Sequence, residues 1–133
     1  MKNSEKIKQG KRNRRMGANF ERRTRKDLEQ KGWFVSKYQN NLDLEQNKMI
    51  PAKASRFRLS TTGFPDFIAY KMYKTLTAKI MFVECKINGK LSKIEKEKAN
   101  WYLKNNVCSK FFIASKYKEN GKVKINYEEI KIK

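Results

Sequence analysis

Two apolar stretches near the middle of the chain decide the fold, and they read Gly63-Phe64-Pro65-Asp66-Phe67-Ile68-Ala69-Tyr70 and Ile80-Met81-Phe82-Val83-Glu84-Cys85-Lys86-Ile87. Both are rich in β-branched and aromatic residues, which favour strands. A polar stretch around Lys74-Thr75 separates them. The pattern therefore predicts a hairpin of two adjacent strands.

Charged residues interrupt this apolar hairpin at three positions. Asp66, one of only three aspartates in the chain, stands at the start of the first strand. Glu84 and Lys86 fall within the second strand, and residues two apart on a strand share a face. Burying charges beside a core is costly unless they serve each other or a metal. We expect the three side chains to form one cluster.

The remaining pattern predicts an α/β domain with a mixed central sheet flanked by helices. An i, i+3, i+4, i+7 spacing that includes Phe20, Glu21 and Leu28 predicts a helix over about residues 17–31 with Glu21 on its inner face. Ser92 and Glu95 form a capping box. Further strands and a helix are expected over 33–38, 93–105, 110–115 and 123–127.

Two segments show no apolar period. Residues 1–16 carry seven Lys or Arg against one Glu and predict a basic flexible tail, which leaves residues 17–133 as a single domain. Residues 39–62 predict a long loop between the first two strands, either a functional loop or a disordered insertion.

Composition narrows the function. A net charge of +20 favours a polyanionic partner such as nucleic acid. The absence of histidine excludes a Ser-His-Asp triad and an HExxH zinc site, and two widely spaced cysteines are too few for a Cys-only zinc site. No apolar run is long enough for a bilayer and no signal peptide is evident, so we expect a soluble, cytoplasmic protein with reduced thiols.

The Pro65-Asp66 pair followed by Glu84-Cys85-Lys86 resembles the PD-(D/E)xK nuclease superfamily. Glu-x-Lys occurs three times in the chain, but only this one lies in an apolar strand after a Pro-Asp. The segment 16–22 (MGANFER) further resembles the archaeal-type Holliday junction resolvases, and the virus-type replication-repair nuclease domains are a related branch. The resemblance implies a restriction-endonuclease-like core and an active site of Glu21, Asp66, Glu84 and Lys86.

The chemistry of these residues agrees with that resemblance. Two carboxylates and the Cys85 backbone carbonyl are hard oxygen ligands suited to Mg²⁺, for which Mn²⁺ can substitute. Such a metal lowers the pKa of a bound water and stabilises charge on a phosphate. Lys86 would hold the attacking water and offset the developing charge. Glu21 would bind metal-linked water or a second ion.

Branched DNA is the expected substrate, and a homodimer is expected because symmetric incision of a four-way junction needs two active sites. Two alternatives stay open: a nuclease of another substrate class, such as a flap or restriction-type enzyme, and a noncatalytic nucleic-acid-binding module. The residues expected to contact DNA are Arg14, Arg15, Arg22, Arg56, Arg58 and Lys98.

Overall fold

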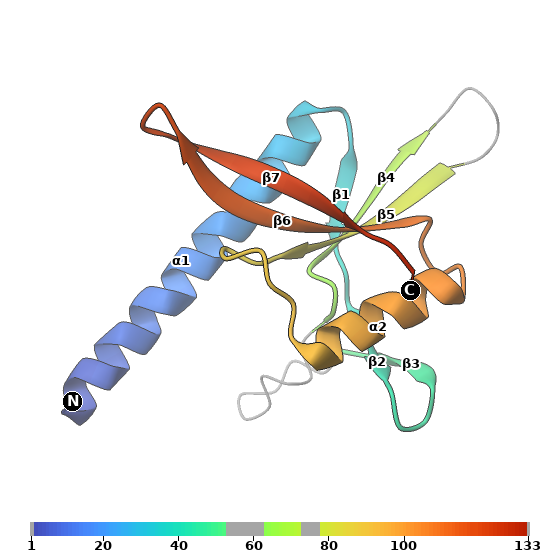
Figure 1. The fold of residues 1–133 in the computed structure, drawn as a ribbon, viewed down its shortest axis with the longest axis horizontal. Coiled ribbons are helices and arrows are strands. Elements are labelled where there is room, and N and C mark those ends of the chain that lie inside the picture. Colours follow the sequence, from blue (N-terminus) through green and yellow to red (C-terminus); the bar gives the residue numbers. More distant parts are fainter. Residues whose placement is uncertain (1, 53–62, 73–77, 133) are drawn as a thin grey trace.

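The computed structural model describes residues 2–52, 63–72 and 78–132. Its main sheet has five strands in the order β1-β4-β5-β6-β7 (Figure 1). The β5–β6 pair is parallel and the other three pairs are antiparallel, so the sheet is mixed. The strands of this sheet are β1 (Phe34–Lys37), β4 (Phe67–Met72), β5 (Ala78–Cys85), β6 (Lys110–Glu119) and β7 (Lys122–Ile130).

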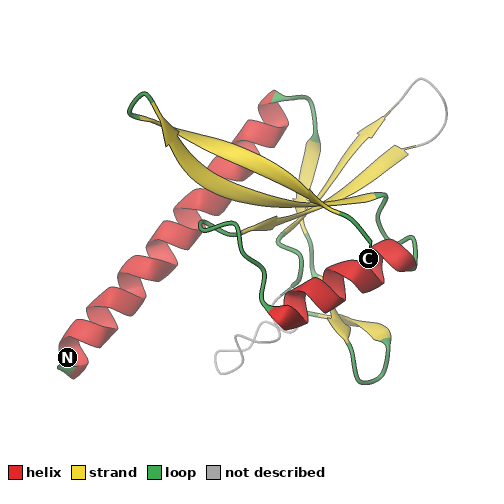
Figure 2. Ribbon diagram, viewed as in Figure 1, coloured by secondary structure: helices red, strands yellow, loops and turns green. Residues whose placement is uncertain are grey.

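Helices α1 (Asn3–Gln30) and α2 (Lys93–Lys104) cover opposite faces of this sheet (Figure 2). On one face, Phe20 and Leu28 of α1 pack in a core cluster with Val83. On the other face, Tyr102 of α2 packs with Phe82. Because neighbouring strand residues point to opposite faces, β5 contributes to both cores. The predicted α/β class with a helix-flanked mixed sheet is confirmed.

The predicted hairpin and the predicted second helix are also confirmed. β4 pairs antiparallel with β5, and Phe67 lies opposite Val83. The Ser92 hydroxyl accepts a hydrogen bond from the Glu95 amide, and the Glu95 carboxylate accepts one from the Ser92 amide. The β6–β7 turn places Asn120 and Gly121 at positive φ, as the Asn-Gly pair predicts.

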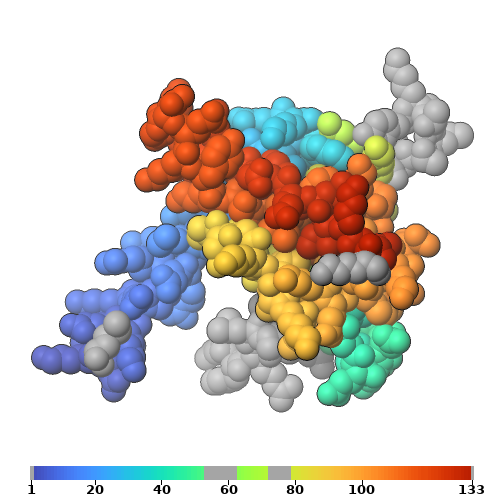
Figure 3. Space-filling view, in the orientation of Figure 1, coloured from blue at the N-terminus to red at the C-terminus, as the bar shows by residue number. Residues whose placement is uncertain are grey.

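The predicted start of the first helix at residue 17 is wrong. Helix α1 begins at Asn3 and runs unbroken to Gln30, so residues 3–16 are helical where a flexible tail is expected. Straight-chain Lys, Arg and Gln residues have high helix propensity. The prediction of a tail rests on the lack of apolar spacing and does not take this propensity into account. The N-terminal half of α1 extends past the sheet and is exposed to solvent (Figures 1 and 3).

The expected long loop is also structured in part. A second, two-stranded sheet pairs β2 (Asn40–Asp43) with β3 (Lys48–Pro51). Leu42 inserts into the core on the α2 face, where it is 2% exposed. Each strand is only four residues long, too short for the alternation to show in the sequence. Residues 53–62 lie outside the described residues.

Gly63 fixes the entry of the chain into β4. A side-chain Cβ at this position would lie 2.1 Å from the backbone oxygen of Tyr38, a distance that no substituted residue can tolerate. The close approach lets the Phe64 amide donate a hydrogen bond to the backbone carbonyl oxygen of Asn40. The Tyr38 amide likewise donates one to the backbone carbonyl oxygen of Asp66. Residue 66 is thereby anchored to the segment that follows β1.

Candidate active site

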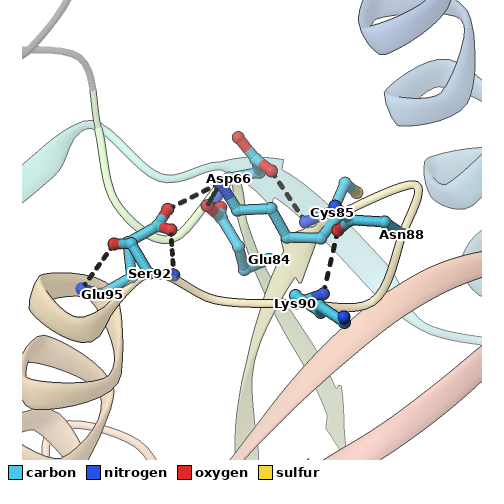
Figure 4. A network of polar contacts seen from close by, with 8 residues as sticks. Asp66, Glu84, Cys85, Asn88, Lys90, Ser92 and Glu95 are labelled. Atoms are coloured by element: carbon cyan, nitrogen blue, oxygen red, sulfur yellow. Dashed lines mark hydrogen bonds and ion pairs between the residues drawn. The ribbon is translucent and has the colours of Figure 1, made fainter.

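Asp66 and Glu84 lie at one edge of the main sheet, where β4 begins and β5 ends (Figure 4). Glu84 Oε1 accepts a hydrogen bond of 2.9 Å from the Asp66 amide. Asp66 Oδ2 accepts one of 2.8 Å from the Cys85 amide. Each carboxylate is thus oriented by the backbone of the other residue's strand. The strand pairing therefore fixes the geometry of the acidic pair.

Lys86 completes the cluster from the segment directly after β5. Its Nζ lies 3.8 Å from Glu84 Oε2 and 2.8 Å from Glu95 Oε2. Glu95 Oε1 also accepts a hydrogen bond from the Ser92 amide (Figure 4). One carboxylate therefore caps α2 and binds Lys86. The sequence identifies Glu95 only as a helix cap. Glu95 lies in the first turn of α2, a few residues after Lys86, and this position in the sequence is the feature that could have indicated its place in the site.

The electrostatics of the cluster are those of an incompletely neutralised acidic pair. Glu84 is 6% exposed. Burial, followed by the charge of Asp66, raises the pKa of Glu84 well above its usual value, and Lys86 offsets this only in part. Burial alone would lower the pKa of Lys86, but its hydrogen bond to Glu95 and the nearby carboxylates outweigh burial and raise it. Lys86 therefore stays charged at neutral pH.

Glu21 reaches the same site from α1. Its side chain is half-buried, and burial followed by the charge of Asp66 raises the pKa of Glu21, against the opposing effect of Lys37. Phe20, Thr24 and Leu28 of the same helix are buried, as the predicted inner face requires. The structure thus brings Glu21 within electrostatic reach of Asp66, across the sheet edge from Glu84.

The Cys85 side chain points to the opposite face from Glu84. Burial raises the pKa of the Cys85 thiol, which is therefore protonated at neutral pH. The thiol is thus a poor metal ligand, and the contribution of this residue to the site is its backbone. Both Cys85 and Cys108 are free.

The residues expected to contact DNA are distributed over several parts of the structure. Arg14, Arg15 and Arg22 are exposed on α1. Lys98 of α2 donates to Asn41 Oδ1 at 2.9 Å, so its described hydrogen bond is to β2. Arg56 and Arg58 lie outside the described residues.

The donor set fits a hard divalent cation. Across residues 2–52, 63–72 and 78–132, no three His, Cys, Asp or Glu side chains form a group that could hold a metal ion. The expected ligands are instead two carboxylates and a backbone carbonyl, and Mg²⁺ keeps several waters beside one or two protein carboxylates. The raised pKa of Glu84 beside Asp66 is the unfavourable charge pairing that a bound cation relieves.

Neither the family models, the curated proteins nor the solved structures include a match to this chain. Within the described residues, no helix is both long and apolar enough to cross a membrane.

Proposed function

We propose that the chain is a metal-dependent DNA endonuclease of the PD-(D/E)xK type that hydrolyses phosphodiester bonds. The observation that carries this proposal is the convergence of Asp66, Glu84 and Lys86 at one sheet edge. A protein that only bound phosphate would gain nothing from a buried carboxylate in a chain of net charge +20. The restriction-endonuclease-like core is part of the same proposal.

Asp66 and Glu84 would hold Mg²⁺ or Mn²⁺, together with the Cys85 backbone carbonyl. When bound, the metal supplies a more acidic water and stabilises negative charge on the scissile phosphate. Glu21 would hold the hydration shell of that ion from the α1 side.

The chain's own residues orient the reaction. The Cys85 and Asp66 amides orient the two carboxylates before substrate binds. Lys86 carries its charge at neutral pH, orients the attacking water and offsets the charge that develops on the phosphate oxygens. Glu95 positions the Lys86 ammonium by an ion pair of 2.8 Å.

The proposed substrate is branched DNA, most specifically a four-way junction cut by a homodimer in the cell interior. The net charge of +20 supports a nucleic-acid partner. The resemblance of residues 16–22 to junction resolvases supports the branched substrate.

The test is cleavage of end-labelled four-way junction, flap, plain duplex and single-stranded DNA with Mg²⁺, with Mn²⁺ or with EDTA. We expect metal-dependent cleavage, fastest on the junction, and a loss of at least about a hundredfold in Asp66→Asn and Glu84→Gln. Both variants keep their DNA affinity or bind slightly more tightly, because only a repulsive negative charge is removed. Glu97→Gln, at an exposed position of α2, is the matched control and cleaves at the wild-type rate.

Each alternative has its own outcome in this test. Preferred cleavage of the flap or of plain duplex by a monomer would replace the junction substrate with a flap or restriction-type one. Binding without cleavage of any substrate in either metal would reduce the chain to a nucleic-acid-binding module.

A further inference from the structure

The face of α1 opposite its buried side chains is basic over most of its length. With 3.6 residues per turn, eight positions between residues 8 and 26 share an arc of about 120°. All eight are exposed, none is acidic, and Asn19 is the only one that is neither Lys nor Arg. We call the other seven the outer stripe: Lys8, Lys11, Arg12, Arg15, Arg22, Arg23 and Lys26.

The outer stripe is directed away from the candidate active site. Phe20, Thr24 and Leu28 are buried on the opposite side of α1. Successive residues of a helix are about 100° apart, so Glu21 turns toward Asp66 while Arg22 turns outward. A DNA strand bound at the sheet edge does not therefore lie along the stripe.

The stripe continues into a groove between α1 and the β6–β7 hairpin. This groove has a volume of about 480 Å³, and Arg23 and Lys26 line it together with Lys31 and Lys124. Its one acid, Asp27, binds Lys31 Nζ at 2.9 Å and accepts from the Tyr127 hydroxyl at 2.6 Å, so its charge is compensated. The groove thus extends the positive surface from the helix onto the sheet.

A polyanion would relieve the repulsion within the stripe. Lys8 and Arg12, Lys11 and Arg15, and Arg22 and Lys26 are like-charged pairs four residues apart, a spacing that destabilises a helix. From the first to the last stripe residue, Lys8 to Lys26, the helix rises by 18 steps and so spans about 27 Å. At 3.4 Å per base pair, that length matches roughly eight base pairs of DNA backbone.

A membrane surface fits this helix less well. Interfacial helices bury one continuous apolar face in the lipid. The large exposed hydrophobics of α1 are Ile7 and Met16. They are nine residues apart and so lie on opposite sides of the helix.

We propose that the outer stripe and its groove bind the backbone of a second duplex segment, separate from the one presented to Asp66 and Glu84. This inference rests on the proposed nuclease function and deepens it. A chain that holds two duplex segments on different faces favours branched DNA, where two arms lie close together, over a single straight duplex.

The test counts duplexes per chain in EDTA, by titrating a 10-base-pair duplex into the full-length protein at about 0.15 M salt, where charges more than a Debye length of about 8 Å apart are screened and direct phosphate contacts remain. We expect two bound duplexes per wild-type chain and one for the triple variant Arg15→Gln, Arg22→Gln, Lys26→Gln. A control triple variant with the same charge loss at exposed positions elsewhere, Lys48→Gln, Lys104→Gln, Lys110→Gln, keeps two. Far-UV circular dichroism checks that all variants fold.

One duplex per wild-type chain, or equal losses in the stripe and control variants, would overturn the proposal. So would stripe-dependent binding to phosphatidylserine vesicles that excludes duplex. Because the titration contains no metal and needs no turnover, a chain that cleaves nothing would refute the nuclease while leaving this count unchanged.

Discussion

Helix α1 contributes to two regions that differ in almost every physical respect. At the sheet edge, Glu21 lies within electrostatic reach of Asp66, and the neighbouring Glu84 is 6% exposed, so its charge is costly. On the outer face, seven basic side chains lie in solvent, where each charge costs little and repels its neighbours. In the proposed function, the first region acts on one phosphate and the second holds many.

The difference between the regions lies in how geometry is fixed. Backbone amides at 2.8 and 2.9 Å orient the carboxylates of Asp66 and Glu84. Arg22, by contrast, is exposed, and its described hydrogen bond is to Asn19 on the same helix. Substitutions at the sheet edge should therefore change reaction rate, and substitutions on the outer stripe should change affinity.

The largest effect expected from this contrast is at Lys86. Lys86→Met should slow single-turnover cleavage by about 10²–10³-fold, because the charge facing the phosphate is removed. Glu95→Gln keeps the helix cap but removes the ion pair that raises the pKa of Lys86. We expect a smaller rate loss and an alkaline limb of the pH–rate profile that moves to lower pH. An alkaline limb at the same pH as in the wild type would show that Glu95 does not set the pKa of Lys86.

A smaller effect is expected from removing residues 1–14, which carry Lys8, Lys11 and Arg12 of the stripe. Each lost phosphate contact lowers the slope of log affinity against log salt by about 0.9. We expect the slope to fall by about three to five, measured by fluorescence anisotropy on a four-way junction. The triple variant Lys8→Gln, Lys11→Gln, Arg12→Gln should account for most of the change. An unaltered slope would mean that this half of α1 does not touch DNA.

Sequence patterns predict most of the sheet edge, because its signals are local. The sequence alone shows the apolar strand around Glu84, the Pro65-Asp66 pair at the start of a strand, and the Ser92 capping box. The proximity of Asp66 and Glu84 follows from the hairpin pairing of β4 with β5. Lys86 continues the side-chain alternation of β5 directly beyond its end.

Other features depend on contacts that no local pattern encodes. The ion pair between Lys86 and Glu95 forms because the first turn of α2 returns to the end of β5. The role of Gly63 is visible only once the Tyr38 oxygen is seen beside it. Apolar spacing does not predict the helical state of residues 3–16, because an exposed basic helix does not need such spacing.

The smallest expected effect concerns stability without metal. The pKa of Glu84 is higher in the folded protein than in the unfolded chain, where it is about 4.5. The stabilisation that the protonated side chain gives to the fold is therefore complete below pH 4.5 and is lost as the pH rises through the folded-state pKa. Glu84→Gln cannot ionise. In EDTA we expect its Tm to exceed that of the wild type at pH 8, with no difference near pH 4.

Thermal unfolding by circular dichroism across this pH range measures the difference, and Glu97→Gln is the matched control. A wild type that is the more stable protein at pH 8 in EDTA would show that Glu84 is well compensated without a cation.

The most direct test of the division between the two regions measures both affinity and single-turnover rate on one four-way junction with Mg²⁺. We expect Glu84→Gln to lose cleavage by at least about a hundredfold at unchanged Kd. The variant Arg15→Gln, Arg22→Gln, Lys26→Gln should bind the junction at least about tenfold more weakly, which corresponds to about 1.4 kcal/mol of lost phosphate contacts. Its cleavage rate at saturating protein should fall much less than its affinity. Rate and affinity that fall together in both variants would contradict the separation of the acidic sheet edge from the outer stripe.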